Sequence, residues 1–290
     1  AALETGKRTP SQSIADPGYF ILGNNTFRDD KVGGHGSVDM AKSIVESCNT
    51  YYSHLARDMG VNPMHDFMKP LGLGQITGID LVGEARGVLP STSWKEKAFK
   101  KPEQQKWFEG ETISLGIGQG YNSFSILQLA HATANLANQG VVMKPHLVKS
   151  IENPITKDRV LTTPQESYKI DLKKENIDVI TNAMVDVNRF GTSAGAFKGA
   201  GYNAAGKTGT AQVYSLNAKN YNHGATPEFL RDHALYVVFA PAENPKIAIA
   251  MIVENAGFGA AHAAPIARRA LDYYLEGRWP KEVPEWKNAP

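Results

Sequence analysis

A short stretch near the last third of the chain carries residue types that could perform two different chemistries. It reads Gly206-Lys207-Thr208-Gly209-Thr210. Taken together with Gly201, it matches Gly-x-x-x-x-Gly-Lys-Thr, a pattern whose backbone amides and lysine hold phosphate groups. Taken as an edge strand, Lys-Thr-Gly-Thr would offer a cation, hydroxyls and a backbone amide along one wall of a groove, and its glycine would let a substrate backbone approach closely. That wall suits a peptide that bears a carboxylate.

The flanking residues favour the second chemistry. A phosphate loop needs a buried strand before its first glycine and a helix that begins at Lys-Thr, because the helix N-terminus supplies the amides and the dipole that hold the anion. Residues 197–205 are rich in glycine and contain no apolar β-branched run, whereas Thr210 to Tyr214 alternates as a strand does. A β-turn made by the glycines is the purely structural alternative.

A second candidate is Ser47-Cys48-Asn49. It lies between two stretches of helical spacing, one from Val38 that includes Met40 and Ile44, the other from Tyr51 to Met59. Alone, a Ser-x-Asn triplet is most simply a helix N-cap. Followed in the chain by Lys-Thr-Gly-Thr, it indicates serine acyl transfer.

Four residues near this triplet could bind a metal ion. Two carboxylates, one imidazole and one thiol suit a closed tetrahedral zinc site. The candidate ligands are Asp16, Asp29, His35 and Cys48, with Asp30 as a substitute for Asp29. The alternative interpretation is a set of unrelated surface residues beside a buried free thiol.

The spacing of apolar residues predicts an α+β (mixed) fold, with an antiparallel sheet packed against a helical subdomain. We expect a loop-rich start with one hairpin over 7–36, and an elaborated loop over 74–122. Helices are expected at 38–45, 51–59, 62–72, 125–138, 177–187 and 266–275, and strands at 141–151, 210–214, 235–240 and 247–254. The helical subdomain would span mainly 37–140, and the sheet with its packing helices mainly 141–277.

Composition excludes several classes of protein. With 42% hydrophobic residues over 290 positions, the chain can build a substantial core. Thirty-one basic and 29 acidic side chains give a formal charge of +2 without a basic tract, so we expect no nucleic-acid partner. No apolar run approaches the roughly 20 residues that span a bilayer. The single cysteine excludes an internal disulfide.

Motifs spread along nearly the whole chain carry a family resemblance. They are Asp16-Pro-Gly, Gly34-His-Gly, Ser43-Ile-Val-Glu-Ser-Cys-Asn-Thr-Tyr-Tyr, Thr77-Gly-Ile-Asp-Leu, Gly116-Ile-Gly-Gln-Gly-Tyr, Lys207-Thr-Gly-Thr-Ala-Gln-Val, Leu230-Arg-Asp-His and Phe239-Ala-Pro. With them the chain resembles the transpeptidase domain of class B penicillin-binding proteins, most of all the elongation-type penicillin-binding protein 2 of Gram-negative bacteria. The resemblance implies the penicillin-binding transpeptidase and β-lactamase-like fold, and elongation-type relatives are expected to carry a zinc.

The resemblance also implies roles for the site residues. Ser47 would relay protons, Asn49 would bind the substrate amide, and Lys207 would hold positive charge beside Ser47. Thr208 and Thr210 would bind the substrate carboxylate, and the Thr210 N–H, with Gly209 before it, would donate to the oxyanion. The chemistry would require no cofactor.

One expected motif does not occur in this sequence. The family attacks its substrate with the serine of Ser-x-x-Lys, and no serine of this chain has a lysine three residues later. The first residues, Ala1 to Gly6, have the pattern of a helix end with Gly6 as its C-cap. We therefore expect residues 1–290 to be one transpeptidase domain whose N-terminal part, with the nucleophile, lies upstream.

The family further implies partners and a location. Peptidoglycan stem peptides would be the substrates and β-lactams the inhibitors, with a cell-elongation glycosyltransferase as a partner of the full-length protein. An N-terminal anchor outside this sequence would hold it at the periplasmic face of the inner membrane. Two alternatives stay open: a β-lactamase or carboxypeptidase of the same superfamily, and a non-catalytic penicillin-recognition or scaffolding module.

Overall fold

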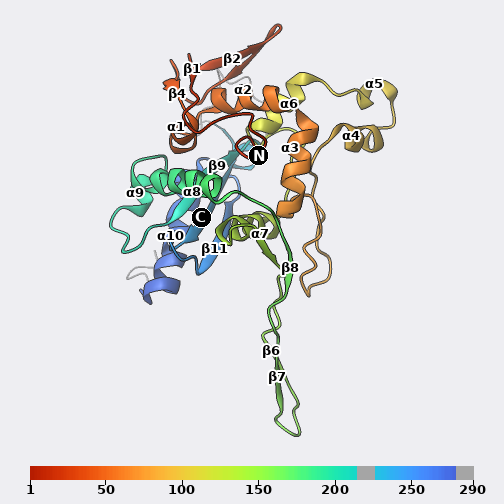
Figure 1. Ribbon diagram of the computed structural model, residues 1–290, viewed down its shortest axis with the longest axis vertical. Helices are drawn as coiled ribbons and strands as arrows, with labels where there is room; N and C mark the ends of the chain where they lie inside the picture. The colour runs from red at the N-terminus through yellow and green to blue at the C-terminus, as the bar shows by residue number, and fades with distance from the viewer. Residues whose placement is uncertain (214–225, 279–290) are drawn as a thin grey trace. The chain divides into compact units, whose positions relative to one another are not determined.

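Helices predominate between residues 40 and 137, after a loop-rich start, and most of the strands follow from residue 141, as the residue patterns predict. The computed structural model describes residues 1–213 and 226–278. The chain divides into two units, Ala1–Met184 and Val185–Pro290 (Figure 1). Of the helices in the described residues, none is long and apolar enough to cross a bilayer.

The loop-rich start of the first unit contains two small antiparallel pairs. Strand β2 (Tyr19–Leu22) forms the predicted hairpin with β3 (Asn25–Arg28). A further pair, which the sequence did not indicate, joins β1 (Ile14–Asp16) to β4 (Gly36–Val38). The loop before β4 passes so close that a Cβ on Gly34 would lie 2.2 Å from the Asp16 carbonyl oxygen. A glycine is therefore needed there for space as well as for its φ of +75°.

A run of helices follows, and two of them lie in close contact. Helix α2 (Asn49–Met59) packs on α6 (Glu109–Gly116) so tightly that a Cβ on Gly116 would lie 2.4 Å from the Cβ of Ala56. Tyr51 and Ile113 are almost wholly buried. The elements are α1 (Met40–Val45), α2 (Asn49–Met59), α3 (Val61–Met68), η1 (Lys69–Leu71), α4 (Thr92–Ala98), α5 (Pro102–Gln105), α6 (Glu109–Gly116) and α7 (Ile126–Ala137).

The prediction of an elaborated loop over 74–122 was wrong in part, because this stretch contains α4, α5 and α6. These helices are short, and they owe their stability to tertiary contacts rather than to a long apolar period. Their centre is Lys95, which is 2% exposed and donates to Glu111 and, at 2.8 Å, to the carbonyl oxygen of Lys106. Its ammonium lies 5.2 Å from the centre of the Phe108 ring and 5.6 Å from that of Tyr121. A buried cation with an acidic partner and aromatic neighbours leaves no periodic signal in a sequence.

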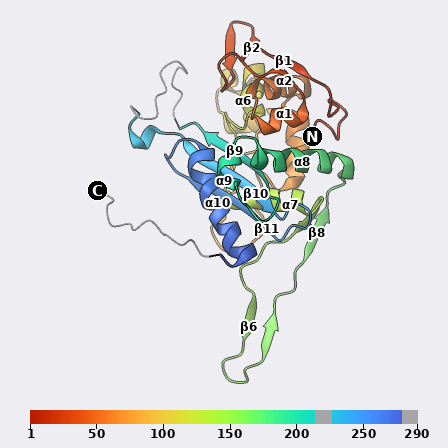
Figure 2. The same cartoon turned by 90° about the vertical axis from the view of Figure 1, so that its left-hand side faces the viewer.

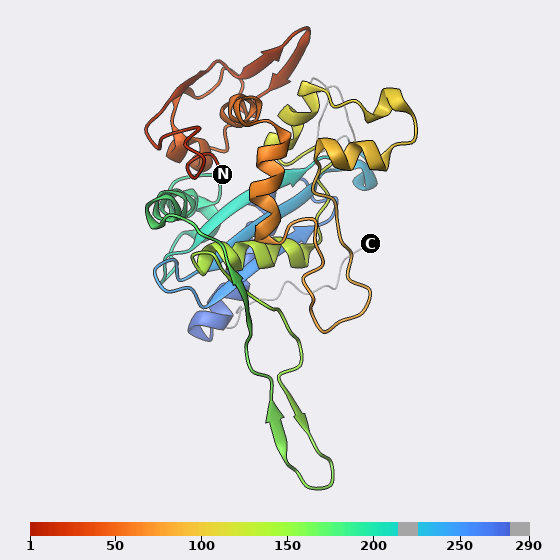
Figure 3. The same ribbon diagram turned by 45° about the vertical axis from the view of Figure 1, so that its right-hand side comes forward.

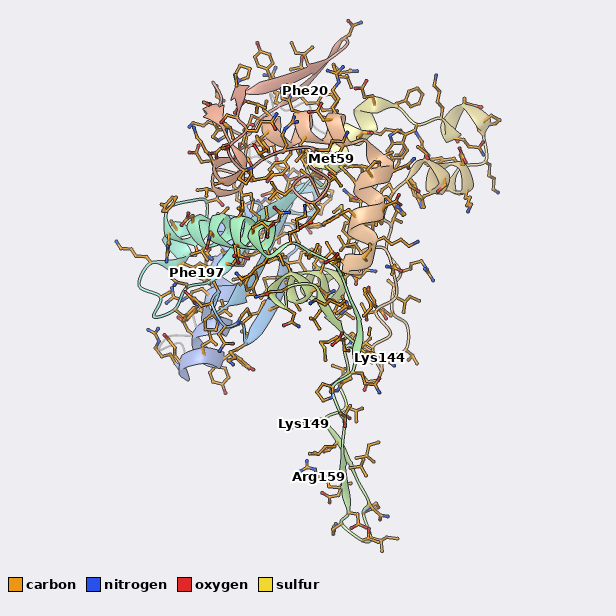
Figure 4. The ribbon with its side chains drawn as sticks, viewed as in Figure 1. Phe20, Met59, Lys144, Lys149, Arg159 and Phe197 are labelled. Atoms are coloured by element: carbon orange, nitrogen blue, oxygen red, sulfur yellow. The ribbon has the colours of Figure 1, made fainter. Side chains whose placement is uncertain are left out.

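Helix α7 leads into a long hairpin. Its N-cap Ser125 and Gln128 form a capping box. The predicted strand over 141–151 consists of two short strands, β5 (Val141–Met143) and β6 (Ser150–Glu152), which pair with β8 (Glu166–Lys169) and β7 (Arg159–Leu161) respectively. The β6–β7 ribbon extends away from β5 and β8 and carries Lys149 and Arg159 (Figure 4). Helix α8 (Lys174–Arg189) follows.

The second unit is a three-stranded antiparallel sheet covered by a helix. The strand order is β11 (Ile247–Val253), β10 (His233–Ala240), β9 (Ala205–Ala211), and the three strands lie side by side in Figure 3. Helix α10 (Gly259–Glu276) crosses the sheet (Figure 2). The unit also contains α9 (Ala194–Phe197) and η2 (Glu228–Leu230).

Small residues bring α10 close to the sheet. Ala263, Ala264 and Ala267 are fully buried against Ala234 and Val238 of β10. The helix starts earlier than the predicted 266–275. The prediction missed its first turns because they consist mainly of glycine and alanine rather than of large apolar residues.

The buried ion pair of Lys95 yields a prediction about stability. Replacing Lys95 with Met keeps its aliphatic volume but leaves the Glu111 carboxylate without its cation, so the free energy of unfolding should fall by about 3 kcal/mol. Denaturant titration measures this change. The control is Lys174→Met, since Lys174 forms an exposed pair with Asp178 and should contribute less than about 1 kcal/mol. Equal effects of the two substitutions would contradict a structural role for Lys95.

Candidate functional site

The Ser47 segment connects α1 to α2 through a strained turn. Helix α1 ends at Val45, and Ser47 adopts a left-handed conformation with φ of +60°. That conformation is uncommon for residues other than glycine, so the surrounding contacts must hold it. The next residue, Cys48, is held in place because its backbone N–H donates to the Ser43 carbonyl oxygen at 3.0 Å. The predicted junction between two helices is therefore present, and Asn49 is the first residue of α2.

The N-cap of α2 is Cys48 and not Ser47. The Cys48 sulfur accepts a hydrogen bond from the Tyr51 backbone N–H at 3.4 Å. Ser47 and Asn49 lie on either side of this cap, and both are half-buried. Helix capping therefore does not explain the serine of the triplet.

The four candidate metal ligands come together in the first unit. Asp16 ends β1, Asp29 follows β3, His35 precedes β4, and Cys48 lies between α1 and α2. Their ligand atoms all lie within 4.8 Å of one another, and Asp30 is not part of this group. Asp16, His35 and Cys48 are at most 9% exposed. Four segments that are separate in the sequence thus meet at one buried point.

Three of the four separations between these groups fit a tetrahedral zinc ion, and the fourth, from His35 to Asp16, is a hydrogen-bond distance. The His35 Nδ1 atom lies 2.8 Å from Asp16 Oδ2 and 3.4 Å from Asp29 Oδ1. The Cys48 sulfur lies 3.4 Å from Asp16 Oδ2 and 3.3 Å from Asp29 Oδ2. Zinc bond lengths of about 2.0–2.3 Å place tetrahedral ligand atoms roughly 3.3–3.8 Å apart. On the far side of the imidazole, Nε2 lies 3.6 Å from a carboxylate oxygen of Glu46, as outer partners of ligating histidines do.

The Asp16 carboxylate is suited to bind a cation, and the Cys48 thiol would become so in the presence of one. Burial opposes ionisation of Asp16, but hydrogen bonds from the Gly18 backbone and from His35 keep its pKa below the usual range. Burial and two neighbouring carboxylates, Asp29 and Asp16, raise the pKa of the Cys48 thiol. A divalent cation would reverse this effect, because it stabilises the thiolate. The residues therefore fit zinc in number, type and spacing.

Strand β9 carries the Lys-Thr-Gly-Thr residues. It is the edge strand of its sheet and pairs only with β10 among the described strands, with Lys207 opposite Val237 and Thr208 opposite Tyr236. The Lys207 ammonium donates to the Thr208 carbonyl oxygen at 3.0 Å. Residues 207–210 are all half-buried. A half-buried edge strand with a cation and two hydroxyls is the arrangement expected of a wall that binds an extended peptide.

The same geometry excludes the phosphate loop. Gly206, Lys207 and Thr208 lie inside a strand, whereas a phosphate loop needs a helix that begins at Lys-Thr. The predicted strand over 210–214 began too late, since β9 starts at Ala205, and Tyr214 lies outside the described residues. Glycines at 206 and 209 hid the strand, because glycine normally weakens one.

The structure adds a residue that the sequence did not indicate. Thr192, in the loop between α8 and α9, has its hydroxyl 2.8 Å from that of Thr208. Its only sequence signal is its place between Gly191 and Ser193 in a short break of the helical pattern. Ser47 and Asn49 belong to the first unit, and Lys207 to Thr210 belong to the second.

Comparisons with known proteins agree with this geometry. The family model described as the penicillin binding protein transpeptidase domain matches residues 1–272. The peptidoglycan D,D-transpeptidase MrdA of Haemophilus influenzae is 42% identical over 283 residues, which is 94% of this chain and 42% of the relative. The corresponding protein of Escherichia coli is 38% identical over 282 residues, 96% of this chain and 44% of the relative. The chain thus spans less than half the length of these relatives.

Solved structures show the same fold. Pseudomonas aeruginosa PBP2 in complex with WCK 5153 superimposes with a TM-score of 0.80 at 37% identity, over 98% of this chain and 61% of that one. Helicobacter pylori PBP2 in complex with MreC gives 0.77 at 26% identity, over 95% and 48%. The resemblance and the mixed α+β fold predicted from the sequence are thereby confirmed. The chain belongs to the family of penicillin-binding protein transpeptidase domains.

Proposed function

We propose that this chain is the acyl-transfer domain of a peptidoglycan D,D-transpeptidase that cross-links stem peptides during cell elongation. The observation that carries the proposal is the edge strand β9, which presents Lys207, Thr208 and Thr210 in a chain of this family. An edge strand can bind an extended peptide through its backbone while its side chains select the peptide.

The reaction would proceed in two covalent steps. A serine hydroxyl attacks the carbonyl carbon of the penultimate D-alanine, a C–O bond forms, and the C–N bond to the terminal D-alanine breaks. The serine proton leaves with the D-alanine amine. An amine of a neighbouring stem peptide then attacks the ester, forms a new amide and returns a proton to the serine.

The residues of this chain would bind and orient the substrate and relay its protons. Ser47 would pass protons between the nucleophile and the leaving amine, Lys207 would supply positive charge, and Asn49 would bind the substrate amide. The Thr208 and Thr210 hydroxyls would hold the terminal carboxylate, with Gly209 leaving room for the peptide. The Thr210 N–H would donate to the oxyanion, a contact worth roughly 3 kcal/mol in comparable sites.

The nucleophile would come from a Ser-x-x-Lys segment of the full-length protein. Within these 290 residues no serine has a lysine three positions later. Thr92 precedes Lys95 at that spacing, but Lys95 is buried and paired with Glu111. This pairing argues against Lys95 as a catalytic lysine.

Partners and location follow from the same proposal. The full-length protein would act at the periplasmic face of the inner membrane, held by an N-terminal anchor, and with a cell-elongation glycosyltransferase. A Helicobacter pylori relative forms a complex with MreC, which supports a place in such an assembly. β-Lactams would acylate the same serine.

We propose further that Asp16, Asp29, His35 and Cys48 bind a structural zinc ion. A closed site of this kind contributes folding energy and supplies no open position for chemistry. Because Cys48 is followed by Asn49 and preceded by Ser47, zinc would hold the Ser47 turn to the strands β1 to β4. The buried donor set described above supports this proposal.

Acylation by a fluorescent penicillin tests the acyl-transfer proposal. In the full-length protein, Lys207→Ala and Ser47→Ala should each lower the second-order acylation rate about 100-fold, since the first removes a positive charge and the second a proton relay. Quenched time courses on gels measure the rate.

Matched controls are Lys198→Ala and Ser37→Ala, which change exposed residues of the same types and should leave the rate unchanged. Absence of labelling in the full-length wild type would favour the scaffolding module. Labelling that disappears within minutes through hydrolysis would favour a carboxypeptidase or β-lactamase.

Elemental analysis and thermal unfolding test the zinc proposal. The purified protein should hold about one zinc per chain, and Cys48→Ser or Asp16→Asn should lose most of it. Removal of the metal by a chelator should lower the midpoint of thermal unfolding of the wild type. The control Asp66→Asn, which changes an exposed carboxylate beside His65, should keep the zinc. A wild-type protein that contains no zinc, and whose midpoint of thermal unfolding does not change with the chelator, would contradict the zinc proposal.

A further inference from the structure

Three buried polar side chains form a closed network in the second unit. Asn188, near the end of α8, donates from Nδ2 to the Ala204 carbonyl oxygen at 2.7 Å. Its Oδ1 accepts from the Ser193 hydroxyl at 2.6 Å and from the Tyr236 hydroxyl at 2.5 Å. The three side chains are at most 6% exposed. Buried networks in which every polar group is satisfied are rigid, because breaking one bond leaves a desolvated group unpaired.

This network lies directly against the start of β9. Ala204 immediately precedes the strand, so the bond from Asn188 fixes its backbone three residues before Lys207. Tyr236 pairs with Thr208 in the ladder, and its hydroxyl fills the space beside Gly206. A Cβ built on Gly206 would lie 2.1 Å from that hydroxyl oxygen and 3.1 Å from Asn188 Nδ2. The strand is thus positioned by contact with the network, and glycine is the only residue type that fits at position 206.

The far end of β9 is fixed by a second close contact, with the start of α10. A Cβ on Gly259, the first residue of α10, would lie 2.3 Å from the Gly209 carbonyl oxygen and 2.2 Å from that of Leu235. The helix start therefore touches the strand backbone. Together the network and the helix leave β9 little freedom to shift along or across the sheet.

We infer that Asn188, Ser193 and Tyr236 are positioning residues for acyl transfer, which set the place of Lys207 and Thr208 through the backbone of β9. The inference rests on the proposed function of β9. None of the three side chains needs to touch the substrate. Their effect would fall on the acylation step, where small misplacements of reacting groups cost large factors in rate.

The Tyr236→Phe variant tests the inference with little disturbance. It removes one hydroxyl and keeps the ring, whose centre lies 5.8 Å from the centre of the Phe197 ring. Asn188 keeps its bonds to Ser193 and Ala204, so the variant should fold. In the full-length protein we expect acylation by a fluorescent penicillin to slow about tenfold. We also expect faster amide hydrogen exchange in peptides that cover residues 205–211.

The matched control is Tyr202→Phe. The Tyr202 hydroxyl donates to Asp272 at 2.8 Å in the same unit, and this bond does not involve β9. The control should lose comparable thermal stability but keep the acylation rate and the exchange of residues 205–211.

The outcomes separate the inference from the function on which it rests. Unchanged exchange of residues 205–211 and unchanged acylation in Tyr236→Phe would overturn the inference while the proposed function stands. Equal slowing in both variants would also overturn it, since a general loss of stability would then explain the effect. A wild-type protein that is not acylated at all would overturn both.

Discussion

Strand β9 can act as the wall of a peptide site because it is held firmly from one side only. Its ladder with β10 uses one edge, and it is the last strand of the sheet among the described residues. Contact with Tyr236 at Gly206 and with Gly259 at Gly209 fixes the position of β9 in the sheet. Space requires a glycine at position 206. The proposed substrate-binding residues, Lys207, Thr208 and Thr210, follow it on the same strand.

In the first unit, too, a segment of the proposed site is held by buried contacts, but the groups that make them differ. Ser47 needs a left-handed backbone, which is unfavourable for serine. Cys48 beside it caps α2 and meets Asp16, Asp29 and His35 at one buried point. Ser47, with its strained backbone, is thus next to Cys48, which several contacts hold in place. The Ser47 segment and strand β9 are thus each held by buried polar groups of their own unit.

Short motifs predicted the family better than residue spacing predicted the elements around the candidate site. Lys207-Thr-Gly-Thr, Ser47-Cys-Asn and the four ligand-type residues were identified from their types, and the structure groups the ligand residues as expected. The start of β9 was missed because the glycine at 206 is required by the hydroxyl of Tyr236, which is distant in the sequence. Helices α4 to α6 were missed because Lys95 and its aromatic neighbours form a buried polar centre without periodicity. Asn188 gave no signal, since a buried asparagine and an exposed one look alike in a sequence.

The central claim is that this site transfers an acyl group from one stem peptide to the amine of another. The direct measurement incubates the full-length protein with uncross-linked glycan strands that bear pentapeptides, and compares released D-alanine with new cross-links after enzymatic digestion and chromatography. The account predicts equal amounts of the two products, because each acyl group that loses D-alanine passes to an amine. Release of D-alanine without cross-links, or no release at all, would contradict it.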